Sequence, residues 1–169
     1  TRGQYFCAVM ESIDYEVFHT ARTKCFFDKK PNEIENIAEM KTAINSTGSE
    51  DYWRDLFKQP DSAFFVLFKK DDNEQVDIIG VADIQFHDFK KYGTKYPQLQ
   101  TGHILTEHRE NQLVDLLYQA RLEFLLKETN FHEVGLAIEP HNTTSIKAAK
   151  RNGFFEVSAT NDSKAKPGT

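Results

Sequence analysis

The stretch that decides the fold reads Glu139-Pro140-His141-Asn142-Thr143-Thr144-Ser145-Ile146-Lys147-Ala148-Ala149-Lys150-Arg151-Asn152-Gly153-Phe154-Phe155. It follows a short apolar run over residues 134–138, which predicts a strand that is covered on both faces. Pro140 restricts Glu139 to extended backbone, so the strand is expected to end near that residue. The chain is therefore expected to leave a buried strand and enter a polar segment here.

A short helix is expected to follow this polar segment. Asn142 or Thr144 can cap it, because either side-chain oxygen can accept a hydrogen bond from an unpaired backbone N–H. Gly153 is expected to end the helix in the left-handed conformation, which glycine adopts at little energetic cost. Residues 154–157 then predict another strand.

A strand, a tight loop and a long helix are expected upstream of this stretch. The strand covers residues 102–105 and the loop covers residues 106–112. The helix covers residues 113–128, because apolar side chains recur along one side of it: Leu113, Leu116, Leu117, Ala120, Phe124 and Leu125. Tyr118 and Arg121 on this helix are expected to be packing and surface residues.

The pattern Asn-x-x-Ser-x-x-x-Ala-x-x-x-Gly-Phe, which begins at Asn142, resembles the late helix motif of the GNAT superfamily of N-acetyltransferases. With the strand, loop and helix before it, the resemblance covers roughly residues 78–157. It implies a GNAT-like acyl-CoA N-acyltransferase fold of the α/β (α+β) class. In that fold a central mixed, mostly antiparallel twisted sheet is flanked by helices.

The resemblance also implies that acetyl-CoA is the co-substrate. In the family the loop carries (Gln/Arg)-x-x-Gly-x-(Gly/Ala), whose backbone N–H groups and helix N-terminus hold the pyrophosphate. A backbone N–H of the preceding strand commonly holds the thioester carbonyl, and Asn142 matches a residue that commonly bonds the pantetheine arm. The cofactor-binding residues implied are His103, Ile104, Leu105, Arg109, Glu110, Asn111, Gln112, Leu113, Val114, Asn142 and Ser145.

The loop departs from the family pattern at two positions. Arg109 matches the first position, but Gln112 and Val114 stand where the family has glycine and a small residue. Glycine permits positive φ angles and close approach of backbone to phosphate, so the two replacements could narrow or reshape the cradle. Arg109 can pair with phosphate, whereas Glu110 opposes it.

The chemistry that the resemblance implies is transfer of an acetyl group from acetyl-CoA to a primary amine by direct attack in a ternary complex. The amine must lose a proton, which calls for a base. Asp83, His103 and Glu139 lie near expected strand ends and are the catalytic candidates; His103 is favoured because its ordinary pKa lies near neutrality. Ala149 stands where many family members carry a tyrosine that protonates the departing thiolate.

Two other functional classes remain open for this chain. Because of Gln112, Val114 and Ala149, the chain could be a non-catalytic GNAT-like acyl-CoA-binding or regulatory module. It could also be an unrelated α/β interaction domain whose many phenylalanines form its core.

The first half of the chain agrees with the same fold. Asn32 and Glu35 predict a capping box for a helix that ends near Asn45. The segment 87–100, with Tyr92, Tyr96 and Pro97, is expected to be the loop that helps to choose the acceptor. The remaining expected elements are strands over 4–10, 63–68 and 78–86 and helices over 14–27 and 50–58.

Composition indicates one domain over residues 1–169, with a flexible tail over about 160–169. The net charge of −5 argues against nucleic acid and suggests a cationic small-molecule or protein amine as acceptor. No run is long enough to span a membrane and no signal peptide is recognised, so we expect a cytoplasmic protein. Cys7 and Cys25 predict no metal site and no disulfide. A final strand is expected to be missing, unusually placed or supplied by a partner chain, and an uncovered strand edge could form a homodimer.

Overall fold

The computed structural model describes residues 4–28, 38–39, 41–42, 49–58, 62–89, 94–109 and 112–157. Its strands are β1 (Tyr5–Val9), β2 (Ser62–Lys70), β3 (Val76–Phe89), β4 (Thr94–Ile104) and β5 (Gly135–Leu136). Its helices are α1 (Tyr15–Phe26), α3 (Ser49–Lys58), α4 (Val114–Glu128) and α5 (Thr143–Arg151), with short 3-10 turns η2 (Ser12–Asp14) and η3 (Thr106–His108).

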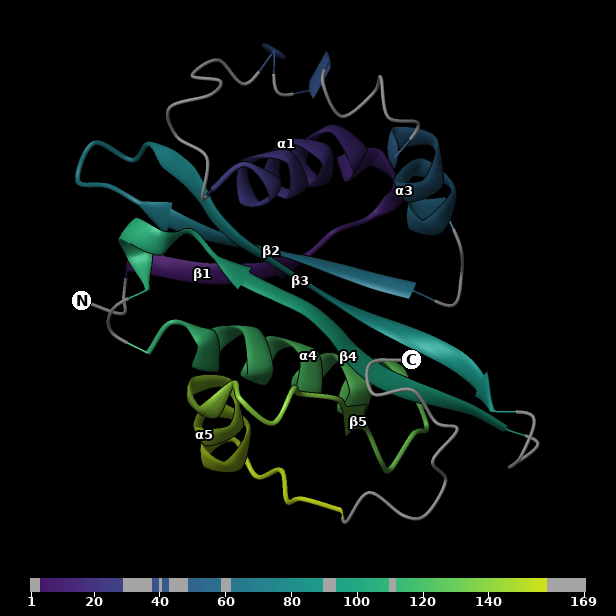
Figure 1. The fold of residues 1–169 in the computed structure, drawn as a ribbon. Helices are drawn as coiled ribbons and strands as arrows, with labels where there is room; N and C mark the ends of the chain where they lie inside the picture. The colour runs from purple at the N-terminus through teal and green to yellow at the C-terminus, as the bar shows by residue number, and fades with distance from the viewer. Residues whose placement is uncertain are drawn as a thin grey trace.

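One sheet organises these elements, in the order β1-β2-β3-β4-β5. The pairs from β1 to β4 are antiparallel, and β4 pairs with β5 in parallel. Helices α1 and α3 cover one face of the sheet, whereas α4 and α5 lie on the other (Figure 1). This confirms the expected mixed, mostly antiparallel sheet flanked by helices.

The run of phenylalanines in β2 serves both faces of the sheet. Successive side chains of a strand point to opposite faces. Phe64 accordingly contacts Phe18 of α1, with ring centroids 4.6 Å apart, whereas Phe65 contacts Phe124 of α4, with centroids 5.7 Å apart. Residues 63–67 are all buried, so β2 joins the two layers of the core.

The strand β4 is much longer than expected. It begins at Thr94, and its register with β3 runs from Phe89 opposite Thr94 to Gly80 opposite Ile104. The prediction of a loop is therefore wrong for residues 87–89 and 94–100, whereas residues 90–93 lie outside the described residues. That loop was implied by the family resemblance, in which the segment between the third and fourth strands helps to choose the acceptor. Pro97 is instead buried opposite Phe86, within the pairing of β3 with β4.

The segment after α5 is not the strand expected over 154–157. Phe154 packs on Tyr118, with ring centroids 5.7 Å apart, whereas Phe155 and Val157 are exposed. No strand among the described residues pairs with this segment, and an unpaired chain has no ladder to hold it extended. Residues 158–169, with the expected tail, lie outside the described residues.

The strand expected over 134–138 is also shorter. Only Gly135 and Leu136 are paired, and they are half-buried rather than covered on both faces. Asn32 and Glu35 lie outside the described residues, although residues 38, 39, 41 and 42 are helical. None of the helices described is both long enough and apolar enough to cross a membrane.

Gly80 allows β3 and β4 to approach closely near the end of their pairing. A Cβ atom at this position would lie 2.8 Å from the carbonyl oxygen of His103, which is part of the backbone and cannot easily move. Glycine therefore sets the position of the last residues of β4, which form part of the site described below.

Candidate functional site

A gap opens between β4 and β5 where their pairing ends. The two parallel strands pair only at Gln98 with Gly135 and at Leu99 with Leu136. Beyond these residues β4 continues to Ile104 without β5 beside it. Backbone groups of β4 on that side are therefore directed into the gap rather than into a ladder.

The hydrogen-bond pattern identifies which backbone donor faces this gap. The N–H of Leu105 donates to the carbonyl of Ile79, at 2.9 Å, and so is committed to β3. Because alternate residues of an antiparallel strand bond the same neighbour, His103 also faces β3 and Ile104 faces away from it. Of the three expected donors, the N–H of Ile104 is the one that the gap presents.

A bulge in β4 precedes this donor. The register opposite Ala82 is Gly102 and that opposite Asp83 is Gln100, so Thr101 is an extra residue in β4. Such a bulge bends a strand and increases its twist. The departure of β4 from β5 begins at this point.

Arg121 holds the bulge from the α4 side of the sheet. Its guanidinium donates to the carbonyl oxygens of Gln100, at 3.1 Å, and Asp83, at 3.4 Å, and its Nε donates to Leu117. Arg121 is 3% exposed, and burial lowers the pKa of its guanidinium. The expectation of a surface arginine is therefore wrong. The sequence carried a signal, because Arg121 lies between Leu117 and Leu125 on the apolar stripe of α4.

Gln112, just before the start of α4, has a backbone conformation that is usual for glycine. Gln112 has a φ of 55°, in the left-handed region that favours glycine. Its carbonyl accepts from the N–H of Asp115, at 3.0 Å, and Leu113 beside it is buried. Val114 packs against the core. The N-terminus of α4 is therefore formed despite both replacements, whereas Glu110 and Asn111 lie outside the described residues.

Asp28, just after α1, connects that helix to the end of β4. Its carboxylate accepts from the backbone N–H of Thr106, at 3.0 and 3.1 Å, and from the Thr106 hydroxyl, at 2.8 Å. It also lies 2.9 Å from Nε2 of His103 and 3.5 Å from the guanidinium of Arg109. Burial raises the pKa of Asp28, but the bonds from His103 and Thr106 outweigh this effect, so the net pKa is lowered.

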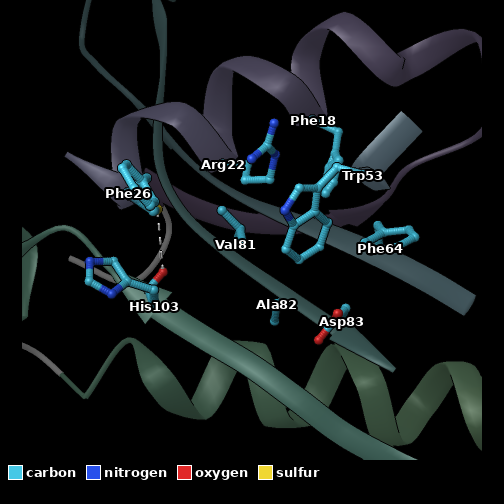
Figure 2. A pocket seen from close by; sticks show the side chains of 10 residues that line it. Phe18, Arg22, Phe26, Trp53, Phe64, Val81, Ala82, Asp83 and His103 are labelled. Carbon is cyan, nitrogen blue, oxygen red and sulfur yellow. Dashed lines mark hydrogen bonds between the residues drawn. The ribbon is translucent and has the colours of Figure 1, made fainter. Parts of the chain in front are cut away.

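The contacts of Asp28 also determine where His103 and Arg109 lie. Arg109 donates through Nε to the carbonyl of Ile104, at 2.8 Å, and its side chain is 44% exposed. Its guanidinium is thus held at the base of the loop and still reaches solvent. The imidazole of His103 points away from Trp53 and Asp83 (Figure 2).

The helix α5 begins and ends as predicted. The side-chain oxygen of Asn142 accepts from the N–H of Ser145, at 3.2 Å, and Gly153 has a φ of 95°. Ala149 is buried. Asp115 in the first turn of α4 binds the end of α5: Arg151 donates to it through Nη2, at 2.8 Å, and through Nε. The two helices are thereby joined at the N-terminus of α4.

A pocket of about 200 Å³ lies on the α1 face of the sheet. Figure 2 shows Trp53 and Phe64 between the helices and the sheet, with Asp83 on β3. We call it the aromatic pocket; the described residues that line it are Phe18, Arg22, Cys25, Phe26, Trp53, Phe64, Val81, Ala82, Asp83 and His103.

The aromatic pocket brings together two of the three expected catalytic residues. Asp83 and His103 line it, whereas Glu139 is exposed beyond β5 and does not. Burial raises the pKa of Cys25 to about 12, with Asp28 adding to the effect, so its thiol stays protonated and is a poor nucleophile. The residues of α1 that line the pocket were not predicted as part of a site. Phe18, Arg22 and Phe26 nevertheless recur at intervals of four residues, which places them on one face of the helix.

Comparison with known proteins gives a family and a fold. The chain matches the acetyltransferase (GNAT) family over residues 30–154. No curated protein matches the sequence significantly.

Three solved structures illustrate the likeness of fold. The aminoglycoside N-acetyltransferase AAC(6')-Iy, in complex with a bisubstrate analogue of CoA, is 19% identical, with 90% of this chain and 91% of that chain covered and a TM-score of 0.60. The aminoglycoside acetyltransferase meta-AAC0020, from an uncultured soil metagenomic sample and in complex with sisomicin, is 13% identical, with 92% and 93% covered and a TM-score of 0.62. A predicted acetyltransferase from Clostridium acetobutylicum with acetyl-CoA is 13% identical, with 92% of each chain covered and a TM-score of 0.52.

Replacing Gln112 by glycine is expected to stabilise the fold by up to about 1 kcal/mol, because a side chain in the left-handed conformation is strained. Urea unfolding at equilibrium would measure the change. Gln119→Gly, on the exposed side of α4, is the matched control and is expected to lose about 1 kcal/mol. An equal loss in both variants would contradict the left-handed assignment.

Replacing Asp28 by asparagine is expected to lower the free energy of unfolding by about 1–3 kcal/mol at pH 7, because charge-assisted bonds to Thr106 are weakened. The folded-state pKa of Asp28 lies below its ordinary value of 3.8, so its contribution is present above that pH and is lost as the pH falls through the lowered pKa. Unfolding measured from pH 7 to pH 2 should therefore show wild type and variant converging at the acid end. Asp77→Asn, at an exposed position of β3, should shift stability by less than about 0.5 kcal/mol. Convergence on the alkaline side would refute this account.

Proposed function

The chain belongs to the acetyltransferase (GNAT) family, and from this premise we propose that it is an N-acetyltransferase that moves an acetyl group from acetyl-CoA to a primary amine. The observation that carries the proposal is the gap between β4 and β5, with the N–H of Ile104 facing it and the N-terminus of α4 after it. Solved structures of the same fold contain CoA or acetyl-CoA, which supports a CoA-based co-substrate.

We place acetyl-CoA between the N-terminus of α4 and the gap beside β4. The N-terminus of α4, at Gln112, Leu113 and Val114, would face the pyrophosphate, since unpaired N–H groups and the helix dipole favour an anion there. Arg109 is close enough to the loop to add a positive charge. The pantetheine arm would enter the gap beside β4, where the amide nitrogen of Asn142 can donate to one of its carbonyls while the oxygen caps α5.

The reaction needs one acyl transfer and one net proton release. The ammonium group loses a proton, and the free amine attacks the thioester carbon. A C–N bond forms and the C–S bond breaks. The nitrogen then loses its second proton and the CoA thiolate takes one up, so that an N-substituted acetamide, the CoA thiol and one released proton are produced. The N–H of Ile104 would stabilise the oxyanion that develops on the carbonyl oxygen. Because Cys25 stays protonated, direct attack in a ternary complex is favoured over an acetyl-cysteine intermediate.

We assign the base to Asp83 rather than to His103. Asp83 lines the aromatic pocket beside the bulge, and its Oδ2 accepts from Gln85, at 3.0 Å. The imidazole of His103 is turned toward Asp28, so His103 positions the start of the loop. No acid is required at Ala149, because a thiol has a pKa near 8.5 and its thiolate can leave and take a proton from water.

Acetyl-CoA is expected to raise the thermal stability of the protein, and Asn142→Ser is expected to weaken that binding about tenfold. Serine caps a helix about as well as asparagine but has no amide donor, so helix capping and pantetheine binding are separated. Calorimetric titration gives the affinity, and thermal unfolding without ligand should be unchanged in the variant. Asn142→Ala is the comparison that loses both roles, with a further loss of about 1 kcal/mol of stability.

Absence of any stabilisation at millimolar acetyl-CoA would overturn the proposed function. A ligand at 100 times its dissociation constant should contribute about 2.7 kcal/mol, which a melting curve readily detects. Binding without thiol release on any amine would instead favour the non-catalytic acyl-CoA-binding module.

Replacing Asp83 by asparagine is expected to reduce kcat/KM for thiol release by about 10² to 10⁴, because a general base contributes an effect of that size. His103→Gln is expected to reduce it less than tenfold, since His103 acts through the loop. Asp77→Asn, on the exposed part of the same strand, should leave kcat/KM unchanged. A larger loss in the His103 variant than in the Asp83 variant would reverse the two roles.

A further inference from the structure

The walls of the aromatic pocket suit an apolar body. Phe18 and Trp53 meet edge to face with ring centroids 5.9 Å apart, and Phe64 lies 4.6 Å from Phe18 and 6.4 Å from Trp53. Phe26 stands at the rim and is 62% exposed. Ring faces and edges of this kind contribute affinity by burying apolar surface, and the indole N–H of Trp53 is the one hydrogen-bond donor that these four rings carry, which is few for a polyhydroxylated ligand.

The charges of the aromatic pocket suit one ammonium group. Among the described residues that line it, Asp83 is the one carboxylate, and it is 1% exposed. Arg22 lines the same pocket, with its guanidinium carbon 5.2 Å from the centre of the Trp53 ring. Asp83 therefore attracts a cation, but the buried guanidinium of Arg121 already interacts electrostatically with it, and the positive charges of Arg22 and Arg121 together oppose a second ammonium group.

The size of the aromatic pocket also favours a small ligand. Its volume of about 200 Å³ is below the roughly 300–1,000 Å³ of pockets that hold drug-sized ligands. A ligand with a single ring fits such a volume better than an aminoglycoside. The register places Asp83 opposite Gln100, directly before the bulge, so an ammonium bound there would lie beside the part of β4 that faces the gap.

We propose that the acceptor is a monocationic primary amine with a compact aromatic or aliphatic body, held in the aromatic pocket with its ammonium at Asp83. This inference rests on the proposed function and specifies its acceptor. It narrows the expectation of a cationic small-molecule or protein amine, which followed from the net charge of the whole chain rather than from the charges at one pocket.

The chain offers a direct test of binding, because Trp53 is its single tryptophan. Phenethylamine added without acetyl-CoA is expected to change the intrinsic fluorescence in a saturable way. With acetyl-CoA present, kcat/KM for thiol release is expected to be at least tenfold higher for phenethylamine than for spermidine or sisomicin.

Two substitutions separate the apolar and the charged contributions. Phe26→Ala removes an exposed wall without removing core, and it is expected to raise KM for phenethylamine about three- to tenfold while kcat is retained. Phe155→Ala, an exposed phenylalanine beyond α5, is the matched control and should change neither constant. Asp83→Asn is expected to weaken phenethylamine binding but not binding of the uncharged analogue 2-phenylethanol.

The outcomes for the acceptor and for the activity can be told apart. Thiol release that is faster with spermidine or sisomicin, or an unchanged KM in Phe26→Ala, would overturn the proposed acceptor while leaving acetyl transfer in place. Saturable binding of phenethylamine that is weakened by Asp83→Asn, but with no thiol released from any amine, would support the ligand class and overturn the activity.

Discussion

The buried guanidinium of Arg121 is the interaction on which the site depends. A bulge leaves strand carbonyls without their regular ladder partners, and buried backbone acceptors without partners are costly. Arg121 donates to the backbone carbonyls of both Asp83 and Gln100, and it does so from α4, on the face of the sheet opposite to the aromatic pocket. This arrangement fixes the point at which β4 leaves β5, the residue whose N–H faces the gap, and the place of the Asp83 carboxylate. The helix α4, which packs on one face of the sheet, therefore determines both the position of the gap and the position of the Asp83 carboxylate on the other face.

The parts of the fold that were predictable from sequence are those that depend on neighbouring residues. A cap needs only Asn142 and the N–H three residues later, and a left-handed stop needs only Gly153, so both are readable from a short stretch. The segment 154–157 shows the converse. Its composition suits a strand, yet a strand exists only where a neighbour pairs with it, and among the described residues none does.

The parts of the site that sequence could not give depend on contacts between distant elements. Asp28 acquires its role from His103 and Thr106, more than seventy positions later in the chain. The aromatic pocket joins side chains from α1, α3 and three strands, and periodicity alone showed only that each faces a core. Gln112 was readable as a departure from the family loop, but only the backbone shows that it adopts a left-handed φ, which favours glycine.

The contact of Asp115 with Arg151 has a consequence for how a long ligand is received. The first turn of α4 is joined to the C-terminal end of α5, because Arg151 and Asn152 both donate to the carboxylate of Asp115. A molecule that binds at the N-terminus of α4 then meets a turn whose position is already held by these bonds. Because this turn is already ordered, the protein loses less conformational entropy when a ligand binds there, and less of the binding free energy is spent on ordering it.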